Sequence, residues 1–293
     1  MSVACSGSVL AAWLPSWALA WLFVVAMPGP MAQAAGFDHS HQAFSALLAR
    51  HVRWNEAGTA SAVDYAGLAR ERPRLDAYTT SLSAVVMQEY AGWSLVQRRA
   101  FLINAYNAFT LQLILTRYPA LESIRDLGNI VFDSPWKRRF FDLLGQRRHL
   151  DEIEHGLLRG APDFDEPRIH FAVNCASVGC PALRPEAYRA DRLDAQLEDQ
   201  TRRFLRDRSR NRFDAAPTPV ARISPIFRWY RGDFEAGHRG VASLEAFLAL
   251  RAEALADTAG DRARVASGRF SIRYTDYSWA LNDVRVVDGV RRP

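Results

Sequence analysis

The chain has 293 residues, of which 49% are hydrophobic, 11% aromatic and 24% charged. This composition excludes wholesale disorder and is sufficient for one large folded domain. The formal net charge is +5, and the basic side chains are almost all arginine. The densest basic run, 202–212, is interrupted by Asp207 and preceded by Glu198 and Asp199. That mixture is typical of a solvated helix face, and no nucleic-acid-binding motif accompanies it, so we expect no nucleic-acid partner.

The first residues have the pattern of a secretory signal. An almost wholly apolar run over 9–26 is followed by a Pro-Gly-Pro break and by small residues at 32 and 34, the positions that a signal peptidase reads. This predicts a signal peptide over residues 1–34 and a periplasmic or secreted mature protein that meets the membrane only through that peptide. No Lys or Arg precedes the run, and an uncleaved anchor is the alternative because the run is almost long enough to span a bilayer.

Helical spacing of apolar side chains predicts two helices near the start of the mature chain, over 37–54 and 68–82. A third helix is predicted over 95–118, where Ser94 and Gln97 have the spacing of a capping box. Its residues are apolar on nearly all sides. We therefore expect this third helix at the centre of the fold.

The remaining chain alternates short strands and helices. The pattern predicts a hairpin around 140–146, a helix capped by Asp151 with Glu154 at the reciprocal position, a strand over 168–174, a helix over 191–206, a strand over 220–223, a helix over 244–255 and a strand over 270–274. Segregated helices with a few short strands predict an α+β fold. We expect a single domain over 37–293, with the central apolar helix packed on a small sheet.

The segment after residue 168 carries the candidate chemistry. Alternating polarity over 168–174 predicts a half-buried strand that points His170 and Asn174 to one face and delivers Cys175 into a loop of small residues. Such a loop exposes a side chain and leaves backbone N–H groups free to bind an oxyanion. Cys175 is therefore the candidate nucleophile, with His170 or His155 as its base and Asn174 as the amide partner.

The cysteines leave a second interpretation open. Loss of the signal peptide would remove Cys5 and leave Cys175 and Cys180 as an isolated pair in an oxidising compartment, where they are spaced to form a disulfide. The leading hypothesis is a thiol-dependent hydrolase or acyltransferase with Cys175 as nucleophile, and the alternative is a non-catalytic periplasmic binding domain with a Cys175–Cys180 disulfide. Its partner is an unidentified small molecule or peptide in both cases. Because the spacing lacks a close pair of zinc ligands, we expect neither a metal nor a cofactor.

Further polar residues lie on predicted helices. His155 and Arg159 are four residues apart, so they share a helix face suited to an anionic group, and Glu154 is placed to fix the imidazole tautomer. Asn104 and Asn107 lie within the most apolar helix, where buried amides need partners. The two asparagines are either structural hydrogen-bonding residues or part of a polar cleft.

The chain resembles the bacterial exported branch of the family called domain of unknown function 547. The resemblance is carried by Phe101-Leu102-Ile103-Asn104-Ala105-Tyr106-Asn107-Ala108, Leu150-Asp151-Glu152-Ile153-Glu154-His155, Arg168-Ile169-His170-Phe171-Ala172, Cys175 with Cys180-Pro181, Ser224-Pro225-Ile226-Phe227, Asp233-Phe234 and Tyr277-Ser278-Trp279-Ala280-Leu281-Asn282. The resemblance implies no settled activity. It also implies a distant similarity to papain- or transglutaminase-like folds, in which the thiol begins the central helix, whereas this helix contains asparagines and no cysteine.

Overall fold

The computed structural model describes residues 36–128, 134–160 and 164–287, and residues 37–293 cluster as one compact unit. The predicted signal peptide lies outside the described residues. Within the described part of the chain, no helix has the length and apolar character needed to cross a membrane.

The first part of the unit is helical. Its elements are α1 (Gln42–His51), β1 (Val52–Trp54), β2 (Ser61–Val63), α2 (Tyr65–Arg70), α3 (Arg72–Ser83), α4 (Met87–Ala91) and α5 (Leu95–Leu115). The helix predicted over 68–82 is two helices. Pro73 lies in the first turn of α3, a position that favours a new helix start, and the Asp64 side chain caps α2. The antiparallel pair β1–β2 continues directly from α1.

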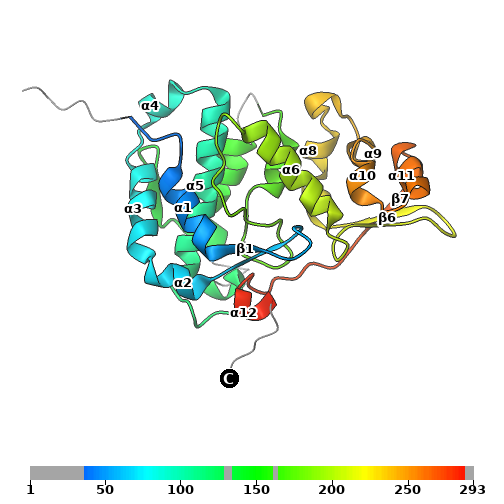
Figure 1. Ribbon diagram of the computed structural model, residues 1–293. Coiled ribbons are helices and arrows are strands. Elements are labelled where there is room, and N and C mark those ends of the chain that lie inside the picture. Colours follow the sequence, from blue (N-terminus) through cyan, green and yellow to red (C-terminus); the bar gives the residue numbers. More distant parts are fainter. Residues whose placement is uncertain (1–35, 129–133, 161–163, 288–293) are drawn as a thin grey trace, which may run out of the picture. The chain divides into compact units, whose positions relative to one another are not determined.

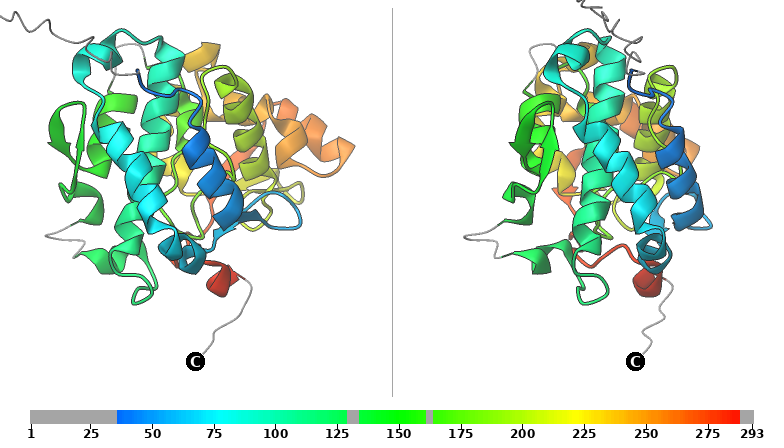
Figure 2. Two further views of the ribbon diagram at one scale, coloured as in Figure 1. Left: turned by 60° about the vertical axis from the view of Figure 1, so that its left-hand side comes forward. Right: turned by 90° about the vertical axis from the view of Figure 1, so that its left-hand side faces the viewer.

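Helix α5 is central, as its sequence predicts. The capping box of Ser94 and Gln97 is formed, and every residue from Ala100 to Leu111 is buried. Figures 1 and 2 show α5 running alongside α3. Phe109 of α5 stacks on Phe141 with ring centroids 3.9 Å apart, so the helix packs on the small sheet formed by β3 (Phe141–Leu143) and β4 (Gln146–Arg148).

The turn of that hairpin has a left-handed backbone at both central residues. Leu144 has φ 55° and Gly145 has φ 75°, the conformation of a type I′ turn, whose twist matches that of the strands it joins. The hairpin predicted around 140–146 is thus confirmed. Two short 3-10 helices, η1 (Ile124–Leu127) and η2 (Pro135–Lys137), precede it.

The helix predicted from Asp151 has a different cap and a different winding. Asp151 makes no capping hydrogen bond. Instead, the His149 ring nitrogen accepts from the Glu152 backbone N–H and the Glu152 carboxylate accepts from the His149 N–H, each at 3.2 Å. The helix, η3 (Glu152–Leu158), is a π-helix, a rare winding that is frequent at functional sites.

The strand predicted over 168–174 is wrong. Residues Pro167–Phe171 form a 3-10 helix, η4, and all five are buried, so the alternation of polarity does not reflect two faces. Pro167 occupies the first turn, and the Glu166 side chain accepts from the Arg168 N–H, which caps the helix. The buried Glu166–Arg168 ion pair, at 2.7 Å, holds the same turn.

The C-terminal part contains a three-stranded sheet. Its elements are α6 (Leu193–Arg206), β5 (Arg212–Asp214), β6 (Val220–Ile223), α7 (Ile226–Trp229), α8 (Arg231–Glu235), η5 (His238–Gly240), α9 (Leu244–Ala249), α10 (Ala252–Leu255), α11 (Ala259–Ala266), β7 (Ser271–Tyr274) and α12 (Val284–Val287). Strand β6 pairs antiparallel with β5 and parallel with β7. The helix predicted over 244–255 is interrupted between α9 and α10.

The described hydrophobic residues form two clusters, one around α5 and one around the β5–β6–β7 sheet. Helix η4 connects them, because Ile169 belongs to the first and Phe171 to the second. Mixed helices and small sheets make the fold α+β. His170, between those two residues, lies at the junction of the clusters.

Candidate functional site

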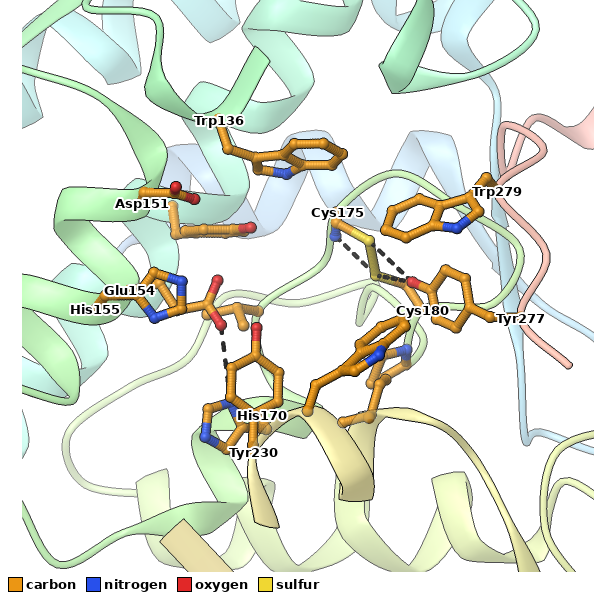
Figure 3. A pocket seen from close by; sticks show the side chains of 15 residues that line it. Trp136, Asp151, Glu154, His155, His170, Cys175, Cys180, Tyr230, Tyr277 and Trp279 are labelled. Carbon is orange, nitrogen blue, oxygen red and sulfur yellow. Dashed lines mark hydrogen bonds and ion pairs between the residues drawn. A yellow bond between two sulfur atoms is a disulfide. The ribbon is translucent and has the colours of Figure 1, made fainter. Parts of the chain in front are cut away.

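A pocket of about 180 Å³ lies beside η4. Figure 3 shows its side chains converging from segments that are far apart in the sequence. The residues that line it are Tyr106, Trp136, Asp151, Glu154, His155, His170, Val173, Cys175, Cys180, Pro181, Ile226, Trp229, Tyr230, Tyr277 and Trp279. The predicted site residues Cys175, His170, His155, Glu154 and Cys180 are therefore brought together around one cavity.

Cys175 and Cys180 form a disulfide in the wall of this pocket. Cys175 is half-buried and Cys180 is 5% exposed. The Tyr277 hydroxyl lies 3.1 Å from Cys175 Sγ and 3.4 Å from Cys180 Sγ, and the Ser177 hydroxyl lies 3.1 Å from Cys175 Sγ. Burial raises the pKa of Tyr277 to about 12, so its hydroxyl keeps the proton that it can donate.

The loop that carries the disulfide is anchored by a side chain predicted for the site. Asn174 Nδ2 donates to the Pro181 carbonyl at 2.7 Å, and its Oδ1 accepts from the Ala176 N–H at 2.9 Å. Asn174 thus ties both ends of the loop together. It does not line the pocket with His170, because the helical turn of η4 replaces the shared strand face that was predicted.

His170 is held by carboxylates. Its Nε2 donates to Asp233 Oδ2 at 2.7 Å, while Nδ1 lies 3.8 Å from Glu154 Oε1. The ring stacks on Tyr230 with centroids 3.7 Å apart. Figure 3 shows the dashed contact between Glu154 and His170 on one side of the pocket and the disulfide on the other.

The two carboxylates of the pocket have pKa values shifted in opposite directions. Burial raises the pKa of Asp151. Burial acts in the same sense on Glu154, but the neighbouring His170 and the Tyr230 hydroxyl outweigh it and hold the pKa of Glu154 below its ordinary value. Glu154 is therefore a carboxylate that is 5% exposed, and Asp151 ionises less readily.

His155 and Arg159 are neighbours, as their spacing predicts. Arg159 Nη1 lies 2.8 Å from His155 Nδ1, and because a guanidinium only donates, Nδ1 accepts and the proton is on Nε2. Arg159 also makes a bidentate ion pair with Asp233: Nε donates to Oδ2 at 2.6 Å and Nη2 donates to Oδ1 at 3.0 Å. Burial acts to raise the pKa of Asp233, but the hydrogen bonds from His170 and Arg159 outweigh it and hold this pKa well below its usual range. The guanidinium is thus already bound to a carboxylate.

The two asparagines of α5 are structural. Asn104 exchanges two hydrogen bonds with the backbone of Tyr188, at 2.7 and 2.9 Å. Asn107 donates to the Ala172 carbonyl at 3.0 Å and accepts from the Asn174 N–H at 2.8 Å. Neither lines the pocket, so Asn107 acts on the site only by fixing the segment that leads into Cys175.

An aromatic wall faces the carboxylates. Trp279 lies 4.6 Å from Tyr277, 5.8 Å from Trp136 and 6.0 Å from Trp229 between ring centroids. Sequence reasoning assigned no role to these rings, nor to Asp233, although several stand in the segments that carry the family resemblance. A signal was present in the density of tryptophan and tyrosine in these short segments, where no core periodicity requires them.

The charge of the lining is acidic. It contains Asp151 and Glu154 and neither Lys nor Arg. Among the described residues, no group of three His, Cys, Asp or Glu side chains is arranged to hold a metal ion. The pocket therefore suits a neutral or cationic organic ligand rather than an anion.

These features define the chain as an α+β protein with an acidic, aromatic pocket and a disulfide in its wall. Residues 90–205 match the family model described as "Protein of unknown function, DUF547". The predicted resemblance to this family is confirmed over these residues. No curated protein and no solved structure matches the chain. The match includes η3, η4 and the disulfide loop, whereas Tyr230, Asp233 and Trp279 lie beyond it.

Proposed function

We propose that this protein is an exported binding domain whose pocket takes a small organic cation, with Cys175 and Cys180 closed as a disulfide. The observation that carries the proposal is the pairing of carboxylates with an aromatic wall in a pocket that lacks Lys and Arg in its lining. An ammonium group placed between them is attracted by the buried charge of Glu154 and by the electron-rich faces of the rings.

The aromatic wall already attracts a cation from within the chain. The Arg125 guanidinium lies over Trp279, 5.3 Å from the ring centroid. The space of about 180 Å³ corresponds to about six water molecules at ~30 Å³ each. It matches a ligand of the size of tetramethylammonium or choline.

A thiol-dependent hydrolase needs a free thiol and an imidazole that takes its proton. His170 Nε2 is bonded to Asp233, and His155 Nδ1 accepts from Arg159. Neither ring, among the described contacts, is hydrogen-bonded to a sulfur. We therefore favour the binding domain over the hydrolase or acyltransferase.

Export is a proposal supported by the signal-like sequence of residues 1–34. Intact-mass measurement of the protein purified from its native host tests it. We expect a mature chain that begins near Ala35. A soluble cytoplasmic protein that retains Met1 would contradict export.

Binding is tested by tryptophan fluorescence and calorimetry with choline and with 3,3-dimethyl-1-butanol, its neutral isostere. We expect choline to bind at least about 10-fold more tightly, the equivalent of ~1.4 kcal/mol. Equal affinity for the two, or binding of a neutral monosaccharide alone, would refute the proposal.

Glu154→Gln removes the buried charge and keeps the shape, so it should lower choline affinity about 10-fold and leave the isostere unaffected. Glu152→Gln is the matched control, because Glu152 is on the same helix and forms an ion pair with Arg139 at 2.8 Å outside the pocket lining. An equal loss of choline affinity in both variants would show that Glu154 does not act as the counter-charge.

A further inference from the structure

The disulfide occupies an unusual position for a structural cross-link, because both of its sulfurs lie in the wall of a ligand-sized pocket. We propose that Cys175–Cys180 is an exchangeable disulfide that reacts with a small thiol admitted to the pocket. This activity goes beyond the binding of a cation, and it is carried by different observations: the unequal exposure of the two cysteines, the donors around their sulfurs and the anchoring of the loop.

The two cysteines differ in exposure. Cys175 is half-buried whereas Cys180 is 5% exposed, so a thiol that enters the pocket meets Cys175 first. Thiol–disulfide exchange requires the attacking thiolate, the attacked sulfur and the leaving sulfur in line. Attack on Cys175 makes the sulfur of Cys180, the more buried cysteine, the leaving group.

Hydrogen-bond donors surround the sulfurs. The Cys175 N–H donates to Cys180 Sγ at 2.9 Å, and the Tyr277 hydroxyl lies within 3.4 Å of both sulfurs. A disulfide sulfur carries no proton, so it accepts whenever one of these groups donates to it, and the single Tyr277 proton can be donated to either sulfur. These donors stabilise negative charge that develops on Cys180 when the bond breaks, as donors at an oxyanion hole do for oxygen.

The loop is held in place without the disulfide. Arg210, which is largely buried, donates to the Cys180 carbonyl at 2.7 Å and to the Val178 carbonyl at 2.6 Å. The N–H groups of Val178 and Gly179 donate to the 278–280 segment, each at 2.8 Å. Gly179 is required there, because a Cβ at this position would lie 2.8 Å from the Ser278 carbonyl oxygen.

These bonds change the expected role of the cross-link. The cysteines are five positions apart, and a disulfide that closes so short a loop gains less from restricting the unfolded chain than one that closes a long loop. The surrounding hydrogen bonds keep the two sulfurs positioned after the bond opens. The disulfide can therefore open and close while the fold persists.

The reaction balances as an ordinary exchange. The thiolate of a small thiol attacks Cys175 Sγ, a bond forms between these two sulfurs, and the Cys175–Cys180 bond breaks with its electron pair on Cys180. A second thiolate then attacks the ligand sulfur of the mixed disulfide. The products are a small-molecule disulfide, which is oxidised, and the Cys175–Cys180 dithiol, whose thiolates take protons from solvent.

The experiment uses the full chain with Cys5→Ser, so that only the pocket cysteines react. The oxidised protein is mixed with cysteamine, quenched with acid, alkylated and digested for mass spectrometry. We expect native protein to open at a rate within about 10-fold of that of the chain in guanidinium, with the mixed disulfide on Cys175. Opening only after unfolding, or a mixed disulfide on Cys180, would overturn the proposal.

Two matched variants test the donors. Tyr277→Phe should slow the exchange by about 10-fold, while Tyr274→Phe, which changes a tyrosine outside the pocket lining, should leave the rate unchanged. Near-ultraviolet circular dichroism shows whether each variant keeps its fold. Equal rates in the two folded variants would contradict the role of the Tyr277 hydroxyl, and the site of the mixed disulfide in the parent chain decides the proposal independently.

A second thiol separates this proposal from the cation-binding function. 3-Mercaptopropionate carries a carboxylate where cysteamine carries an ammonium, so the acidic lining should favour cysteamine by about 10-fold per thiolate. Exchange with no charge preference supports the exchangeable disulfide and contradicts the cation pocket. Choline binding to a protein whose disulfide opens only on unfolding supports the cation pocket and contradicts the exchangeable disulfide.

Discussion

Replacing Asn107 with alanine removes the side chain that joins the central helix to the segment before the disulfide. The amide donates to the Ala172 carbonyl at 3.0 Å and accepts from the Asn174 N–H at 2.8 Å. Asn107 is 2% exposed, and both partners are buried as well. Water cannot replace the amide without opening the packing around η4.

The magnitude follows from what the substitution leaves behind. An unsatisfied buried donor or acceptor costs about 1–3 kcal/mol. The variant leaves one of each, so the free energy of unfolding should fall by about 2–6 kcal/mol. For a domain of this size each kcal/mol corresponds to ~2–4 °C, which places the loss of melting temperature near 10 °C.

Urea unfolding followed by circular dichroism measures this loss. Gln112→Ala on the same helix is the control, because Gln112 is only half-buried and one of its two partners, Asp76, is also only half-buried, so water can replace the amide there. We expect the control to lose less than about 1 kcal/mol. The reasoning is refuted if Asn107→Ala is as stable as the control.

Three further outcomes are expected. Burial lowers the pKa of His41 to about 4 from 6.5, so neutral His41 contributes ~3 kcal/mol to the free energy of unfolding, a contribution that is complete above pH 6.5 and is lost as the pH falls toward 4. The free energy of unfolding of His41→Asn, measured by urea melts, should therefore depend less on pH across this range; the same pH dependence in both proteins would contradict this. The pKa of Asp233 is held low by His170 and Arg159, so Asp233→Asn should destabilise the protein at pH 7. The difference in stability should shrink as the pH falls below ~4, because the unfolded chain then takes up a proton that the native carboxylate does not yet bind; a constant difference down to pH 2 would show no such linkage. Phe109→Ala should lower the free energy of unfolding by about 3–5 kcal/mol, measured by thermal unfolding, because the ring no longer stacks on Phe141 of β3. A loss below ~1 kcal/mol would show that the stack is not part of the core.

Local signals in the sequence predicted much of the fold. The capping box of Ser94 and Gln97, with apolar residues on all sides, placed α5 and its central position. The hairpin at β3–β4 and the strands β6 and β7 also follow from patterns of a few neighbouring residues. These elements depend on interactions within one turn or one strand pair, which a short window of sequence contains.

Tertiary contacts decided the site. The alternation over 168–174 has the period of a strand, yet burial on every side and the Glu166–Arg168 pair make a 3-10 helix there. His170 is bonded to Asp233, 63 residues away, and Tyr277 reaches Cys175 across 102 residues. The sequence by itself determined which residue types carry chemistry and that the cysteines are spaced to pair. Which groups meet at the pocket was decided by the packing of distant segments, because no periodicity along a chain encodes the distance between side chains that only the folded core brings together.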